Sequence, residues 1–100
     1  MDLTESFPIA QERTAEGHLL APAGELDIAT VPLLEAAYEE VAHAPVLLDL
    51  SAITFVDSSG LQLLLRLSER GAGRIEIVSS PSLDRLLDIT AVRDRLPIRG

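Results

Sequence analysis

Residues 46–61 decide the fold, and they read VLLDLSAITFVDSSGL. The first part of this stretch is an almost unbroken apolar run, which is typical of a strand buried on both faces in a parallel sheet. After Asp57, small polar residues give way to leucines at helical spacing from Leu61 onward. We therefore expect one buried central strand that extends to Val56 and turns directly into a helix, which is the repeating unit of α/β folds.

The segments on either side complete this pattern. The sequence predicts, in order, strands at 7–10 and 18–24 joined by a turn, a helix capped by Thr30 and ended by Pro45, the central strand, a helix ended by Gly71 and Gly73, a strand at 74–78, a helix opened by Ser80, and a terminal strand at 96–98. We expect an α/β single domain over residues 1–100, with residues 1–6 loose. Its sheet is expected to be mixed and four- to five-stranded, with an N-terminal antiparallel hairpin and helices from parallel crossovers.

The composition restricts the possible functions. The chain has 100 residues and a net charge of −8, with eight arginines, no lysine and no cysteine. An acidic protein repels nucleic acids and anionic membranes, so neither is an expected direct partner. The lack of cysteine excludes disulfides and thiolate metal sites. Because no signal-peptide pattern is present and no apolar stretch approaches the roughly 20 residues of a membrane span, we expect a cytoplasmic protein.

Ser58 stands at the junction between the central strand and the next helix. It is the expected N-cap, with its hydroxyl accepting a hydrogen bond from the amide of Gly60 or Leu61. The free amides and the positive end of the helix also favour an anion at this position. On capping physics alone, a structural cap is the simpler interpretation.

A nucleophilic serine is the enzymatic alternative for Ser58. The nucleophile elbow of hydrolases requires Gly-x-Ser-x-Gly, and here Val56 stands where the first glycine belongs. The available bases are His18 and His43, and neither lies in a recognisable catalytic context. We therefore expect that the protein is not an enzyme and has no catalytic residues.

No cofactor and no metal site are expected. The phosphate-binding loop Gly-x-x-x-x-Gly-Lys cannot occur in a chain without lysine. The carboxylates of Glu35, Glu39 and Glu40 fit the solvated face of a helix rather than a set of metal ligands.

Three pieces of the sequence together resemble the STAS domain family. They are Gly24-Glu25-Leu26-Asp27 followed by Thr30, the strand 46–50 followed by Phe55-Val56-Asp57-Ser58-Ser59-Gly60-Leu61, and Ser80-Pro81-Ser82-Leu83 followed by Leu86-Leu87-Asp88-Ile89-Thr90. The resemblance runs from about His18 to Ile98. Within the family, the chain is most similar to the bacterial anti-sigma factor antagonists.

The resemblance implies a STAS-type domain that regulates transcription through protein–protein interaction, without cofactor or catalysis. It implies that an anti-sigma factor serine kinase phosphorylates Ser58 with Mg-ATP, and that a dedicated phosphatase removes the phosphate. The unphosphorylated form would bind the kinase and release a sigma factor, and the phosphoprotein would not. Partner contacts are expected at Glu25, Asp27, Thr30, Asp57, Ser59, Gly60 and Gln62.

Two residues depart from the usual pattern of the family. Gln62 lies close to the expected docking surface, where many antagonists have glycine, and Pro22 stands where an apolar strand residue is usual.

Two alternative functions are compatible with the same fold. One is a STAS regulatory subunit of a transporter or of a stress-signalling complex, and the other is a purely structural interaction domain in which Ser58 is never modified.

Overall fold

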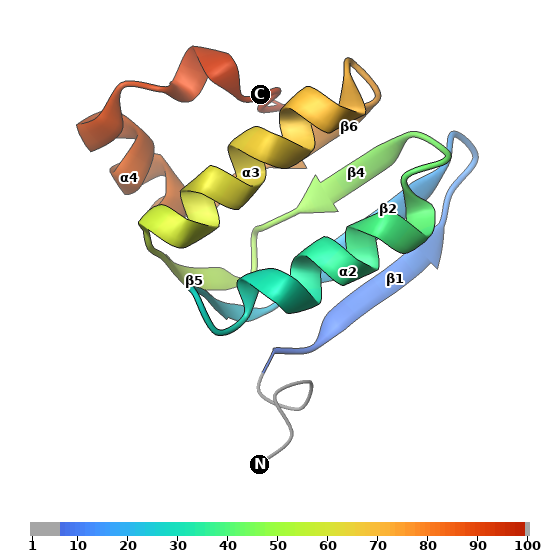
Figure 1. Ribbon diagram of the computed structural model, residues 1–100, viewed down its shortest axis with the longest axis horizontal. Helices are drawn as coiled ribbons and strands as arrows, with labels where there is room; N and C mark the ends of the chain where they lie inside the picture. The colour runs from blue at the N-terminus through green and yellow to red at the C-terminus, as the bar shows by residue number, and fades with distance from the viewer. Residues whose placement is uncertain (1–6, 100) are drawn as a thin grey trace.

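The computed structural model describes residues 7–99, so the expectation that residues 1–6 are loose lies outside the described part. The elements are, in order, β1 (Ile9–Arg13), β2 (His18–Pro22), β3 (Gly24–Leu26), α2 (Val31–Val41), β4 (Val46–Asp49), β5 (Ile53–Val56), α3 (Ser58–Gly71), β6 (Ile75–Val78), α4 (Pro81–Thr90) and the short 3₁₀ helix η1 (Arg93–Arg95). Figure 1 shows α2 and α3 lying side by side over the strands, with α4 at the end of the molecule where β5 lies.

The strands form two sheets. The larger has the order β1-β2-β4-β6, in which β1 pairs with β2 antiparallel while β2–β4 and β4–β6 are parallel. The smaller sheet consists of β3 and β5, which are parallel. The expected mixed α/β domain with an N-terminal hairpin and parallel crossovers is therefore confirmed. The predicted terminal strand at 96–98 is reduced to one parallel bridge between Ile77 and Ile98.

The hairpin is tied to the amino end of β4. Its turn closes where the amide of Thr14 donates to the carbonyl of Gly17, 2.8 Å away. A side chain at Gly17 would collide with the backbone of Pro45, which explains the glycine.

Pro22 is accommodated at the last position of β2, opposite Ile9, because the ladder ends there. The predicted strand at 18–24 thus stops at Pro22, and β3 starts separately.

The expected single central strand over 46–56 is wrong, because the chain turns after Asp49. The carboxylate of Asp49 accepts a hydrogen bond from the amide of Ser51 at 3.0 Å, and the amide of Ile53 donates to the carbonyl of Leu50 at 2.9 Å. Aspartate favours such turns because its side chain can bond to the backbone two residues ahead. The turn ends β4 and sends β5 into the second sheet, beside β3.

The core lies between the larger sheet and the helices. Leu20, Leu48 and Ile77 face this core and are fully buried. Side chains that alternate with them along the strands are less covered, since Leu47 is half-buried and Glu76 is exposed. The central strand was expected to be buried on both faces; β4 is instead buried completely on one face only. The helices contribute Leu34, Tyr38, Val41, Leu61, Leu63, Leu64, Leu67, Leu83 and Leu87.

Two helices end in an unexpected residue. α3 runs to Gly71, and the left-handed residue that terminates it is Ala72, with φ 46°. α4 ends in the same way at Ala91, with φ 56°. The prediction assigned the first of these ends to glycines, because glycine adopts positive φ without steric cost.

Candidate functional site

The candidate site lies where two parallel strands end side by side. In the β3–β5 pair, Glu25 is opposite Phe55 and Leu26 is opposite Val56. The pairing continues past the strands, because the amide of Asp57 donates to the carbonyl of Leu26 at 3.2 Å. The loop after β3 and the start of α3 therefore meet at one edge, although they are far apart in the sequence. In Figure 1, α2 and α3 both begin at the end of the molecule where β5 lies.

Asp57, and not Ser58, is the N-cap of α3. Its backbone is extended (φ −99°, ψ −175°), and its carboxylate accepts a hydrogen bond from the amide of Gly60 at 2.9 Å. The expected Ser58 cap is therefore wrong by one residue. Aspartate and serine are about equally good caps, so side-chain preference could not separate them.

Ser58 is consequently the first residue of the helix, and its side chain is exposed. Because Asp57 caps the helix, the Ser58 hydroxyl is not needed to hold the helix terminus. The neighbouring Ser59 is only half-exposed. Between the two serines, Ser58 is the more accessible to a partner.

Gly60 is present because the backbone of β3 comes very close to α3. A Cβ atom at this position would lie 2.7 Å from the carbonyl oxygen of Leu26 and 2.9 Å from the Leu26 Cγ. Both distances are shorter than a carbon atom tolerates. Gly60 is buried, and because it has no Cβ atom the helix can start directly against the end of β3.

The loop after β3 is held by its own side chains. The Asp27 carboxylate accepts hydrogen bonds from the amides of Ala29 at 3.0 Å and Thr30 at 3.2 Å. The Thr30 hydroxyl donates to the carbonyl of Glu25 at 2.7 Å and accepts from the amide of Asp27 at 3.0 Å. Thr30 is the N-cap residue of α2, as expected, but its side chain makes no capping hydrogen bond to the helix. Asp27 and Thr30 therefore shape the loop.

Two further exposed side chains lie on the elements that meet at the candidate site. Gln62 is exposed and lies four residues after Ser58, so both occupy the same face of α3. Ile28, at the tip of the Asp27–Thr30 loop, is 76 % exposed. Sequence reasoning missed Ile28. The signal was present, because an apolar residue directly after a turn aspartate falls outside the buried stripe of α2.

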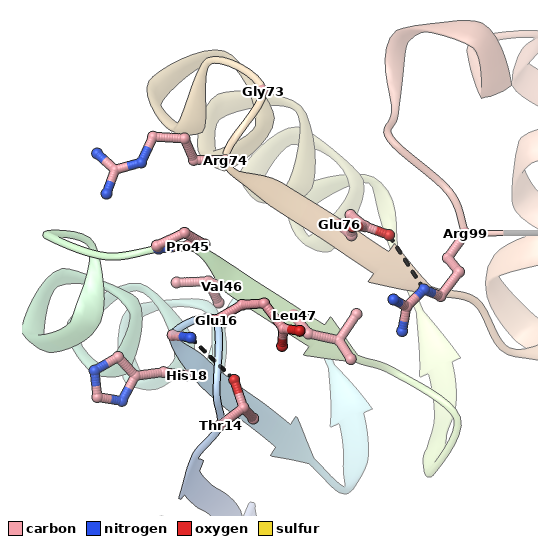
Figure 2. A pocket seen from close by; sticks show the side chains of 11 residues that line it. Thr14, Glu16, His18, Pro45, Val46, Leu47, Gly73, Arg74, Glu76 and Arg99 are labelled. Carbon is pink, nitrogen blue, oxygen red and sulfur yellow. Dashed lines mark hydrogen bonds and ion pairs between the residues drawn. The ribbon is translucent and has the colours of Figure 1, made fainter.

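The two histidines lie far from Ser58. Their rings pack edge to face with centroids 5.6 Å apart, and His18 is in register with Val46 at the start of β4. That end of the molecule is opposite the start of α3 (Figure 1). A hollow of about 360 Å³ also lies there, between the hairpin turn and the starts of β4 and β6 (Figure 2). Its lining includes His18, Arg74 and Arg99 and none of the predicted site residues.

Residues 7–99 contain no group of three or more histidine, cysteine, aspartate or glutamate side chains placed to hold a metal ion. Within this range, no helix combines the length and the apolar character that crossing a bilayer would require.

Three solved structures share the fold. An anti-sigma factor antagonist from Mycobacterium paratuberculosis is 25 % identical with a TM-score of 0.83, over 100 % of this chain and 91 % of that one. A putative anti-sigma factor antagonist from Thermotoga maritima is 18 % identical with a TM-score of 0.78, over 92 % and 86 %. The anti-sigma factor antagonist SpoIIAA in its unphosphorylated form is 16 % identical with a TM-score of 0.67, over 92 % and 88 %.

The sequence comparisons give the family. No curated protein sequence matches the chain at a significant level. The family described as "Mlab, STAS domain" matches residues 9–95, which is most of the chain. The match includes both strands of the candidate site, the Asp27–Thr30 loop and all of α3. The chain belongs to the STAS domain family.

Proposed function

We propose that this protein is an anti-sigma factor antagonist that is switched by phosphorylation of Ser58. In this proposal the unphosphorylated form binds an anti-sigma factor kinase and so releases a sigma factor. The kinase transfers the γ-phosphoryl group of ATP to the Ser58 hydroxyl, which ends the interaction, and a phosphatase removes the phosphate. The similarity to structures that are themselves named anti-sigma factor antagonists supports the proposed partner class.

The observation that carries the proposal is the position of Ser58. Its side chain is exposed at the first position of α3, while Asp57 supplies the cap that a serine could otherwise have supplied. A serine that is accessible and not required for the helix terminus can be modified without loss of the fold. The hydrogen-bonded Asp27–Thr30 loop and the end of β5 lie at the same edge of the domain as this position.

The local effect of a phosphate at Ser58 would be small. It adds about −1.5 to −2 charges at neutral pH. The helix terminus stabilises a negative charge by roughly 0.3–1 kcal/mol, and the adjacent Asp57 carboxylate opposes it. Because these contributions nearly offset each other, the fold should survive phosphorylation. At an interface shaped for a neutral hydroxyl, an unpaired charge costs several kcal/mol, so binding should be strongly weakened.

A binding role is favoured over catalysis because the potential bases are remote. His18 and His43 pack on each other at the opposite end of the domain from Ser58. No lysine is present to activate a hydroxyl. We therefore infer that Ser58 is a phosphoryl acceptor and not a nucleophile of this protein's own chemistry. The net charge of −8 also favours protein partners over nucleic acid or membrane, in keeping with a cytoplasmic regulator.

The proposal is tested by intact-mass measurement after incubation with Mg-ATP and a candidate kinase, the kinase-type anti-sigma factor encoded nearest to this gene. One added phosphate is expected on the wild-type chain and on Ser59→Ala, and none on Ser58→Ala. Ser59→Ala is the matched control, because it removes the neighbouring hydroxyl and leaves Ser58 in place. Phosphate on Ser58→Ala, or no transfer to the wild-type chain, would contradict the proposal.

A further inference from the structure

Large apolar side chains are exposed at few positions, and two of them lie in the candidate site. Within residues 7–99 the exposed large apolar residues are Ile28 (76 %), Phe55 (47 %) and Ile89 (81 %). Phe55 lies on β5, in register with Glu25 of β3, and Ile28 follows the end of β3 by two residues. Ser58 follows the end of β5 by the same two residues. Because the strands are parallel and paired, Ile28 and Ser58 occupy corresponding positions beyond them.

Ile28 is held by a fixed loop rather than by a flexible one. The residues on both sides of it are bonded, since the Asp27 carboxylate accepts from the amides of Ala29 and Thr30 and the Thr30 hydroxyl donates to the carbonyl of Glu25. A side chain on such a loop loses little conformational freedom when a partner covers it. An exposed isoleucine on a hydrogen-bonded backbone costs little to order and gains free energy when it is buried.

The charges around Ile28 indicate the kind of surface that would cover it. The segments 24–30 and 53–60 contain the carboxylates Glu25, Asp27 and Asp57 and no arginine. Farther along α3, Arg66 and Arg70 are paired with Glu35 of α2 and so do not neutralise this edge. An apolar side chain within an acidic edge is complementary to an apolar pocket with a basic rim.

We propose that Ile28 is the apolar anchor by which this domain binds the anti-sigma factor kinase, entering an apolar pocket with a basic rim on that partner. The inference rests on the proposed function and adds the residue that supplies binding free energy beside the Ser58 switch. Ser58 then decides whether the complex forms, and Ile28 contributes to how tightly it forms. Anchors of this kind carry a large share of the affinity of an interface.

The role of Ile28 is tested by calorimetric titration of this protein and its variants against the kinase-type anti-sigma factor encoded nearest to the gene. Ile28→Ser should lose about tenfold to a hundredfold in affinity, because an isoleucine no longer leaves water on binding. Ile28→Leu should keep affinity within a few-fold of the wild type. The matched control is Ile89→Ser, which removes an equally exposed isoleucine from α4, outside the site. Both serine variants should keep the wild-type thermal midpoint, because neither side chain is in the core.

The outcomes separate this inference from the proposed function. If the wild-type chain binds, Ser58→Asp binds poorly and Ile28→Ser binds like the wild type, the anchor is refuted while the switch stands. If Ile28→Ser and Ile89→Ser weaken binding equally, the anchor is refuted as well. If the wild-type chain does not bind the kinase at all, both proposals fail. Wild-type affinity should also fall as salt is raised, and affinity independent of salt would contradict the basic rim.

Discussion

The carboxylate of Asp57 accepts a hydrogen bond from the amide of Gly60 at 2.9 Å, and this contact defines the start of α3. It satisfies one of the amides that every helix leaves unpaired in its first turn. It also leaves the next residue, Ser58, at the first helical position with an exposed side chain. Asp57 caps the helix and Ser58 remains accessible, and the proposed switch depends on this arrangement.

The capping role predicts that Asp57→Ala lowers the free energy of unfolding by about 0.5–2 kcal/mol. Asp57→Asn should cost much less, because an asparagine side-chain oxygen can accept the same hydrogen bond. Chemical denaturation of the two variants beside the wild type measures the difference. Equal stability of Asp57→Ala and Asp57→Asn would show that the hydrogen bond to Gly60 contributes nothing.

The close approach of α3 to β3 predicts that Gly60→Ala is destabilising by about 1–3 kcal/mol, as overpacked sites usually are. The added methyl group would stand 2.7 Å from the carbonyl oxygen of Leu26, a backbone atom that cannot move without disturbing the β3–β5 pair. Ser59→Ala is the control at the adjacent position and should be nearly neutral. The measurement is the thermal midpoint, and an unshifted midpoint for Gly60→Ala would disprove the tight packing.

The left-handed helix ends predict two stabilising substitutions. Ala72 and Ala91 have φ of 46° and 56°, where an alanine pays about 1–2 kcal/mol in steric strain. Ala72→Gly and Ala91→Gly remove this strain but increase the entropy of the unfolded chain, so the net gain should be about 0.5–1 kcal/mol each. Denaturant unfolding of both variants tests this, and a loss of stability in either would mean that the backbone there is not left-handed.

The carboxyl of Asp84 predicts a small acid dependence of stability. The hydrogen bond from the Ser79 hydroxyl at 2.7 Å, followed by the hydrogen bond from the Arg93 guanidinium at 3.3 Å, holds the pKa of Asp84 below its usual value. A carboxyl whose pKa is lowered by folding stabilises the protein above its unfolded pKa, and this contribution disappears as the pH falls through the folded pKa.

Ser79→Ala should therefore be less stable than the wild type at neutral pH, and the difference should shrink on acidification. Because Asp84 is about half exposed, the effect is limited by solvent screening. Urea unfolding of both proteins from neutral to strongly acidic pH provides the comparison. A stability difference that stays constant over this range would show that Asp84 is not linked to folding.

The sequence predicted the three helices well, because apolar residues at helical spacing report directly on burial. The strand–helix junction near Ser58 was also visible, since small polar residues follow an apolar run there. The length of the central strand could not be predicted, because the turn that ends it lies inside an apolar segment. There the Asp49 carboxylate accepts a hydrogen bond from the amide of Ser51. The separate β3–β5 sheet follows from that turn and was missed for the same reason.

The candidate site was predicted in part. The Asp27–Thr30 loop and the start of α3 do lie together, as the parallel strand ends require. The cap at Asp57 rather than Ser58 was not predictable, because either side chain can cap a helix and only the backbone angles decide which residue is the N-cap. Ile28 was overlooked, although its place directly after a turn aspartate and outside the buried stripe of α2 was a signal of exposure.

Calorimetric titration of the candidate anti-sigma factor kinase with the Ser58-phosphorylated and unphosphorylated chains tests the central claim most directly. Phosphorylation should weaken binding by about a hundredfold or more, because like charges or an unpaired charge at an interface cost several kcal/mol and each 1.4 kcal/mol is about tenfold in affinity. Ser58→Ala should bind like the unphosphorylated chain, and Ser58→Asp should bind poorly with an unchanged thermal midpoint. Equal affinity of the phosphorylated and unphosphorylated chains would show that Ser58 is not a switch.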